Sequence, residues 1–123
     1  MKNTICWFEI PVYNFDQAEA FYNHIFGIKL HRGETKGFLM GVFTGGDEEG
    51  VHGAIVKGEG YIPCDHGPVV YLNGGEDLNN VLSKVEEAGG SILMGKTFIN
   101  QSVGYVAMFY DTEGNKIGLY SEK

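Results

Sequence analysis

Three side chains of this sequence combine chemical capability with positions that a strand could bring together: Trp7, Glu9 and His52. A carboxylate such as Glu9 can act as a base or orient a hydrogen-bond donor, and burying it without a partner is costly. An imidazole can serve as a base or as a metal ligand, and the single tryptophan offers a stacking surface. Each also has a structural interpretation: a carboxylate at a wet rim, a solvated histidine at a strand end, and an indole that only fills space.

The segment Ile5–Val12 predicts the strand that positions Trp7 and Glu9, because it is rich in β-branched and aromatic residues. Side chains alternate across a strand, so one face carries Trp7 and Glu9. The opposite face is uniformly apolar and should meet a helix; it consists of Cys6, Phe8, Ile10 and Val12. We therefore expect Trp7 and Glu9 to point toward a concave inner face.

A helix should follow this strand directly. Asn14 can cap it, with Gln17 answering from the third helical position, and Gly27 is placed to end it in a left-handed conformation. The apolar residues between them recur at intervals of three and four, which gathers them on one side of the helix: Phe15, Ala18, Tyr22, Ile25 and Phe26. Three strands are expected next, with turns at Gly33 and at Gly45–Asp47: Ile28–Arg32, Gly37–Phe43 and Val51–Lys57.

The second half of the chain repeats this order. It has a strand over Val69–Asn73, a helical stripe from Leu78 to Ala88 and three more strands, the last over Lys116–Ser121. A constant shift in numbering carries Trp7 to Val70 and Gly27 to Gly90. The sequence therefore predicts a duplicated βαβββ module, with module one at 4–57, a linker at 58–67 and module two at 68–122.

The same alternation selects the remaining residues of the inner face. It gives His52 from the fourth strand, Val70 and Leu72 from the fifth, and Gly118 and Tyr120 from the last. The predicted ligand-binding set is therefore Trp7, Glu9, His52, Val70, Leu72 and Tyr120. A cleft of this composition would bind an apolar or aromatic small molecule through burial and stacking, with Glu9 as the candidate catalytic residue.

Composition excludes several other functions. The 16 acidic and 9 basic residues leave a formal charge of −7, which opposes nucleic-acid binding when no basic patch is present. No apolar run approaches the roughly 20 residues of a membrane-spanning helix. The two cysteines form no CxxC motif, and the first residues lack the features of a signal peptide. We expect a cytoplasmic protein that binds neither nucleic acid nor membrane.

Two motifs connect this pattern with a known group of proteins: FYNHIFG at Phe21–Gly27 and DTEGN at Asp111–Asn115. Together with the duplication, they resemble the vicinal oxygen chelate superfamily of glyoxalases, bleomycin-resistance proteins and ring-cleaving dioxygenases, and within it the branch of predicted enzymes related to lactoylglutathione lyase. The resemblance implies an α+β fold in which two tandem βαβββ modules form a curved, mostly antiparallel sheet around a cleft. It also implies a homodimer, because the modules leave open sheet edges that relatives pair between chains.

Catalytic relatives hold a divalent metal with one His or Glu from each of four inner strands. The resemblance carries those positions to Trp7, His52, Val70 and Gly118, and of these only His52 can ligate a metal. We therefore expect no metal cofactor. The alternative is a reduced site in which His52 and Glu9 hold a divalent metal that water or substrate completes.

Three functions follow from these alternatives. The first is a metal-independent, glyoxalase-like protein that binds a small organic molecule, with Trp7 stacking on it and Glu9 orienting it. The second is a metal-dependent lyase, isomerase or dioxygenase with metal at His52 and Glu9. The third is an accessory or interaction domain whose cleft has no ligand. The sequence leaves open whether the protein is an enzyme.

Overall fold

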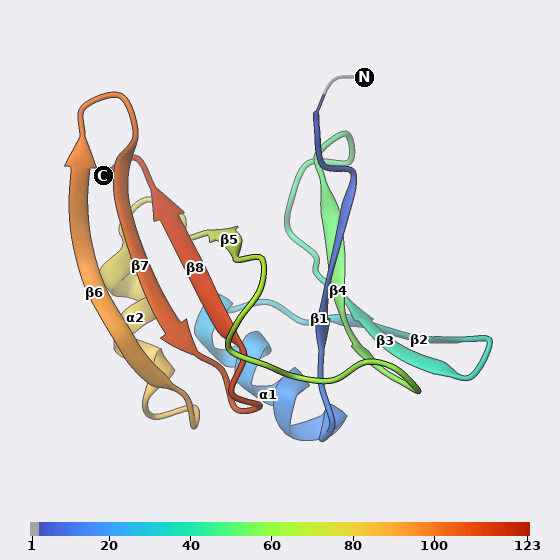
Figure 1. The fold of residues 1–123 in the computed structure, drawn as a ribbon. Helices are drawn as coiled ribbons and strands as arrows, with labels where there is room; N and C mark the ends of the chain where they lie inside the picture. Colours follow the sequence, from blue (N-terminus) through green and yellow to red (C-terminus); the bar gives the residue numbers. More distant parts are fainter. Residues whose placement is uncertain (1–2) are drawn as a thin grey trace.

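The computed structural model describes residues 3–123 and contains two successive βαβββ modules (Figure 1). Module one consists of β1 (Trp7–Pro11), α1 (Phe15–Phe26), β2 (His31–Thr35), β3 (Phe38–Val42) and β4 (His52–Lys57). Module two consists of β5 (Val70–Asn73), α2 (Leu78–Val85), β6 (Ser91–Asn100), β7 (Gly104–Tyr110) and β8 (Lys116–Ser121). The predicted α+β fold of tandem modules is confirmed.

The eight strands form two sheets of four, with strand orders β1-β4-β3-β2 and β5-β8-β7-β6. In each sheet the first pair is parallel and the other two pairs are antiparallel. The sequence predicted one sheet shared by both modules. Within residues 3–123 no strand of one module pairs with a strand of the other. The modules are joined by a shared hydrophobic core and by side-chain hydrogen bonds.

Helix α1 begins as predicted, but part of its N-terminal cap comes from the second module. The Asn14 side chain accepts a hydrogen bond from the Gln17 N–H (3.2 Å), and Gly27 ends the helix with φ 63°. The Asn14 N–H, however, donates to Glu113 Oε2 (2.7 Å), which lies in the turn before β8. The second half of the predicted cap therefore comes from Glu113 and not from Gln17, and it ties the start of α1 to module two.

One continuous hydrophobic core lies between the helices and both sheets. Ile10 and Val12 are fully buried in it, and Phe8 packs against it, as the alternation of the first strand predicted. The rings of Phe21 in α1 and Phe109 in β7 lie 5.8 Å apart and link the modules. Cys6 is an exception to the predicted set: it precedes β1 and is exposed, because the regular strand begins only at Trp7.

A buried carboxylate fixes the junction of the modules. Asp111 accepts hydrogen bonds from the Tyr22 hydroxyl (2.7 Å), from the side-chain amide of Asn115 (3.0 Å) and from two backbone N–H groups of its own turn. The Asn115 amide also donates to the Pro11 carbonyl in β1 (2.8 Å). Burial raises the pKa of Asp111 and raises that of Tyr22 well above its usual value. The DTEGN motif is thus a turn whose side chains connect α1, β1 and β8.

The boundaries of two strands differ from the prediction. Gly33 was expected to form a turn, but it lies within β2, and the turn is made by Lys36 and Gly37. Both have positive φ (50° and 86°), which suits the two-residue loop of a hairpin. The first of the three strands expected after the second helix extends over ten residues as β6, at an edge of the second sheet.

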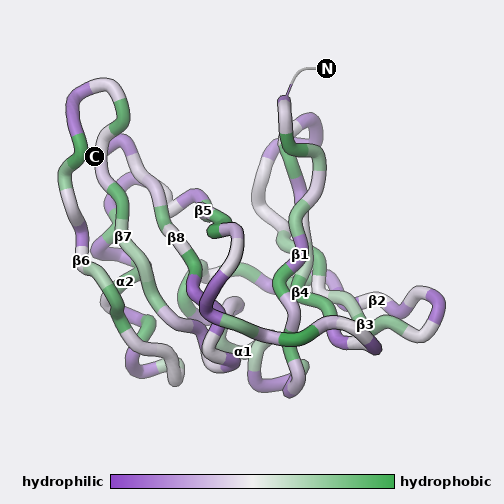
Figure 2. The backbone as a smooth tube through the Cα atoms, viewed as in Figure 1, coloured by the Kyte–Doolittle hydropathy of each residue, from purple (hydrophilic) through white to green (hydrophobic). Residues whose placement is uncertain are grey.

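Hydrophobic residues recur along β4 and β7, whereas hydrophilic residues gather in the turns (Figure 2). Among residues 3–123, no helix has the length and apolar character needed to cross a bilayer.

Candidate functional site

The carboxylate of Glu9 is held on the exposed face of β1 by two aromatic side chains. The indole N–H of Trp7 donates to Glu9 Oε2 (3.1 Å), and the Tyr61 hydroxyl donates to Glu9 Oε1 (2.6 Å). Trp7 is 39% exposed and Glu9 is also exposed, on the side of the strand opposite the buried Ile10. Each carboxylate oxygen therefore has one fixed donor and retains capacity to accept another hydrogen bond.

Tyr61 is the residue of this cluster that the sequence did not identify. It lies between Gly58 and Val69, a segment without helix or strand, and its ring packs edge-on against Phe38 of β3 (5.4 Å between centroids). The hydrogen bond to Glu9 raises the pKa of the Tyr61 hydroxyl, so this group remains a donor at neutral pH. No strand alternation applies to such a segment, and an aromatic residue in the linker was the only signal.

The linker covers part of the face on which Glu9 lies. It crosses in front of the first sheet in Figure 1, and Ala54, which lies beside Glu9 in β4, is fully buried. Glu9 and Trp7 therefore lie at the margin of the sheet face that the linker partly covers. A bound molecule could contact the carboxylate and the indole together at this margin.

The predicted orientation of Val70 and Leu72 is wrong. The register between β5 and β8 pairs them with Ile117 and Leu119, which are buried in the core, and Leu72 itself is only 8% exposed. A slip of one residue in such a short apolar strand exchanges its faces. The sequence offered no polar residue at Val69, Val70 or Leu72 to fix the alternation.

Tyr71 occupies the exposed face in their place. It pairs with Gly118, is 48% exposed, and its ring covers the glycine so closely that an added Cβ there would lie 2.5 Å from it. Tyr120 follows on the same face of β8, as predicted, and is half-buried. Tyr71 and Tyr120 therefore lie on the non-core side of β5 and β8.

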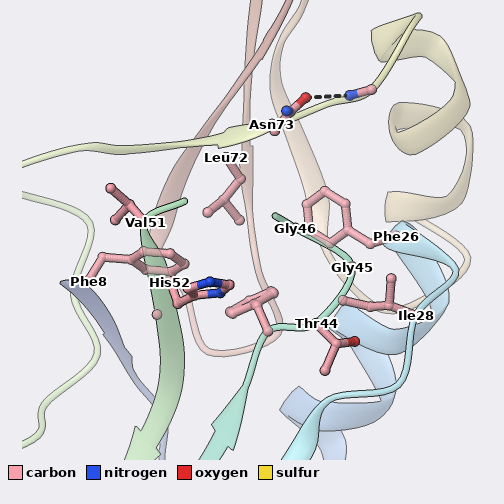
Figure 3. A pocket seen from close by; sticks show the side chains of 13 residues that line it. Phe8, Phe26, Ile28, Thr44, Gly45, Gly46, Val51, His52, Leu72 and Asn73 are labelled. Atoms are coloured by element: carbon pink, nitrogen blue, oxygen red, sulfur yellow. Dashed lines mark hydrogen bonds between the residues drawn. The ribbon is translucent and has the colours of Figure 1, made fainter. Parts of the chain in front are cut away.

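His52 does not join Glu9. It is the register partner of Trp7 at the start of β4, but its ring lines a cavity of about 370 Å³ together with Phe8 and Leu72 (Figure 3). Its Nε2 atom lies 3.4 Å from the Glu48 carbonyl oxygen, and neither Trp7 nor Glu9 borders this cavity. The structure thus divides the predicted site into two places, one with Trp7 and Glu9 and one with His52 and Leu72.

A comparison with models of protein families tests the resemblance that the modules and motifs suggested. Residues 4–119 match the model of the Glyoxalase/Bleomycin resistance protein/Dioxygenase superfamily. The chain belongs to this superfamily. The resemblance inferred from the duplicated modules and the DTEGN turn is therefore confirmed. A search among curated proteins finds no significant match.

Solved structures of the superfamily share this fold. A glyoxalase/bleomycin resistance protein from Albidiferax ferrireducens T118 is 13% identical, with a TM-score of 0.74 over 98% of this chain and 100% of that one. Glyoxalase I from Zea mays is 17% identical, with a TM-score of 0.68 over 95% of this chain but 44% of the maize chain. The trypanothione-dependent glyoxalase I of Leishmania major is also 17% identical, with a TM-score of 0.68, covering 98% and 88%. At these identities the similarity concerns the fold alone.

The residues present do not fit the divalent metal of catalytic superfamily members. Among residues 3–123, no three His, Cys, Asp or Glu side chains come together in a group that could hold a metal ion. Of the residues at the corresponding strand positions, Trp7 and Gly118 have no ligating atom, and Tyr71 replaces the predicted Val70. Hard or borderline divalent ions need several oxygen or nitrogen ligands, so we derive no reaction step through a metal.

Proposed function

We propose that this protein binds a small organic molecule at the margin of the first sheet, with Glu9 accepting a hydrogen bond from it and Trp7 stacking on it, without a resident metal. The observation that supports this proposal is the fixed orientation of the Glu9 carboxylate between the Trp7 indole and the Tyr61 hydroxyl. A carboxylate held by two donors loses little conformational freedom when a ligand arrives.

The chemistry of the face defines the ligand. Glu9 needs an O–H or N–H donor, and Trp7 favours a ring or another flat apolar group, a contact worth on the order of 0.5–1.5 kcal/mol beyond burial. The formal charge of −7 disfavours an anionic ligand. The expected ligand is a neutral or cationic molecule that has both an apolar ring and a hydrogen-bond donor.

Glu9 is also the residue that we propose for any proton transfer at this site. Its carboxylate is exposed and has a defined direction, so a bound molecule can bring a proton within hydrogen-bond reach of it. The metal-dependent alternative through His52 and Glu9 gains no support, because these two residues share no contact and face different partners.

We further propose that a second copy of the chain covers this face. Small-molecule sites usually bury most of the ligand surface, and the margin at Trp7 is too open to do so alone. The chain exposes many large apolar side chains on strands and their flanks, which a homodimer would cover: Ile5, Trp7, Tyr13, Tyr71, Ile92, Leu93, Phe98 and Ile99.

The fluorescence of Trp7, the single tryptophan, provides the test. Benzyl alcohol, benzamide and S-benzylcysteine are titrated into the protein, and at least one is expected to give a saturable change. Glu9→Gln should weaken that binding about tenfold, because a charged acceptor is lost. Glu59→Gln removes the same charge from an exposed linker position and should leave the affinity unchanged. Equal binding by wild type and Glu9→Gln, or no response to any probe, would contradict the proposal.

A further inference from the structure

A second site lies where the two modules meet. Its cavity, of about 370 Å³, is bounded by the end of α1, the loop before β4, the start of β4 and the end of β5 (Figure 3). Trp7, Glu9 and Tyr61 do not line it, so it is separate from the proposed site on β1. Its volume is at the lower end of the range of small-molecule pockets, which suits a compound of one or two rings.

Aromatic side chains form the walls. The rings of Phe8 and Phe43 lie 5.5 Å apart, and those of Phe26 and Phe43 lie 6.3 Å apart. Gly53 makes this arrangement possible, because a Cβ at that position would lie 2.3 Å from the Phe8 ring. The residues that line the cavity include no Asp, Glu, Lys or Arg. Such walls favour a planar apolar ligand.

Three polar side chains border the cavity: Thr44, His52 and Asn73. The Thr44 hydroxyl donates a hydrogen bond to the Lys29 carbonyl oxygen (3.0 Å). The Asn73 side-chain oxygen already accepts a hydrogen bond from the Gly75 N–H (2.9 Å). Next to the cavity, the turn that precedes Val51 and His52 carries Asp47, Glu48 and Glu49. These acidic side chains disfavour an anionic ligand at the mouth.

His52 determines which polar group the ligand must carry. Its Nε2 atom faces the Glu48 carbonyl oxygen at 3.4 Å, and because a carbonyl can only accept a hydrogen bond, this contact favours the tautomer with the proton on Nε2. In the neutral ring the other nitrogen, Nδ1, is then an acceptor. Among residues 3–123 no group donates to this atom. A ligand that donates a hydrogen bond would fill this place.

We propose that the cavity at the module junction binds a neutral aromatic compound with an O–H or N–H donor, of the phenol or indole class, and that its donor binds His52 Nδ1. The rings of Phe8, Phe26 and Phe43 enclose the apolar part of the ligand. This proposal is independent of the function proposed for Glu9, because the two sites share no lining residue.

The test uses fluorine NMR of two probes, 4-fluorophenol and 4-fluoroanisole, which differ in that the methyl ether cannot donate a hydrogen bond. Wild-type protein is expected to broaden the 4-fluorophenol signal in a saturable manner and to bind 4-fluoroanisole about threefold to tenfold more weakly. In a Glu9→Gln background, which removes the charged acceptor of the site on β1, His52→Leu should remove this preference. Equal affinity of wild type for both probes would overturn the donor assignment.

A pair of matched variants tests whether 4-fluorophenol binds in this cavity. Val51→Phe narrows the mouth, whereas Val103→Phe makes the same change in the turn between β6 and β7; the two valines are 37% and 38% exposed, so both variants should fold. In the same Glu9→Gln background, Val51→Phe should abolish binding of 4-fluorophenol, and Val103→Phe should leave it unchanged. Binding that survives Val51→Phe, or that is lost in Val103→Phe, would overturn the assignment to this cavity.

Discussion

The direction of the Glu9 carboxylate depends on two donors that come from different segments. Trp7 lies two residues away on the same strand, and Tyr61 reaches Glu9 from the linker after β4. Trp7 and Glu9 could be predicted as neighbours because strand alternation places them on one face. Tyr61 could not, because its direction depends on how the linker crosses the sheet and on the packing of its ring against Phe38.

Tyr61→Phe tests this orientation. The variant keeps the ring on Phe38 and removes only the hydroxyl donor to Glu9. We expect the affinity for the best probe of the Trp7 titration to fall about threefold to tenfold, since Glu9 is no longer fixed. The thermal midpoint should change little, because the hydrogen bond is near the surface. Tyr13→Phe, at a side chain that is 59% exposed, is the control; an affinity equal to that of wild type in Tyr61→Phe would argue against the orienting role.

At the scale of elements, α1 follows from local sequence more closely than the strands do, whereas α2 ends at Val85, before the Ala88 that the helical stripe predicted. Asn14 and Gly27 delimit α1 where the sequence predicted, because caps depend on a few neighbouring residues. The strands near Gly33 and Val70 were displaced or reversed. Their limits depend on partners far along the chain: β2 is set by its hairpin with β3, and the faces of β5 by its register with β8.

The cap of α2 predicts a pH dependence of stability. Asp77 accepts a hydrogen bond from the Asn79 N–H (2.9 Å) and one from Lys96 (3.0 Å), and these contacts lower the pKa of its carboxyl below the ordinary value of 3.8. A carboxyl with a lower pKa in the folded state stabilises the fold above its unfolded pKa. That contribution is lost as the pH falls from 3.8 through the lower folded pKa.

Asp77→Ala should therefore lower the thermal midpoint at pH 7, and the difference from wild type should shrink as the pH falls below about 4. Thermal melts across this range measure the effect. Asp47→Ala serves as the control, because Asp47 lies in an exposed turn and its side chain makes no hydrogen bond within the described chain. A difference that stays constant with pH would show that the cap acts without its charge.

At the scale of the whole molecule, the two modules are joined by helix packing and by the buried Asp111 rather than by a continuous sheet. The Tyr22 hydroxyl brings α1 to this carboxylate, and Asn115 connects it to β1. The duplication could be predicted from the sequence because both halves repeat the same order of elements. The junction between the modules could not be predicted, because it pairs residues that lie far apart in the chain, such as Tyr22 and Asp111.

Tyr22→Phe should weaken this junction by removing one donor to Asp111 while keeping the ring in the core. We expect the free energy of unfolding to fall by about 1–2 kcal/mol, as for a buried hydrogen bond to a charged group. Urea denaturation measures the change. Tyr110→Phe, at a half-buried tyrosine whose hydroxyl has no hydrogen-bond partner among residues 3–123, should have a much smaller effect. Similar losses in both variants would mean that the contact with Asp111 is not the cause.

The division of the predicted site into two places also belongs to this scale. Sequence alternation assigned Glu9 and His52 to one cleft, but the loop before β4 and the end of α1 enclose His52 separately. Which strand-end side chain turns into such a cavity depends on how the two modules meet. Neither the composition nor the periodicity of the sequence predicts how the two modules meet.

The most direct test of the central claim is a titration of Trp7 fluorescence with the best-binding probe in the presence of EDTA and again after addition of Zn²⁺, Ni²⁺, Fe²⁺ or Mn²⁺. If Glu9, Trp7 and Tyr61 form a site that needs no metal, the probe binds with the same affinity in all of these solutions. Binding that vanishes with EDTA and returns with one of the metals would contradict the account.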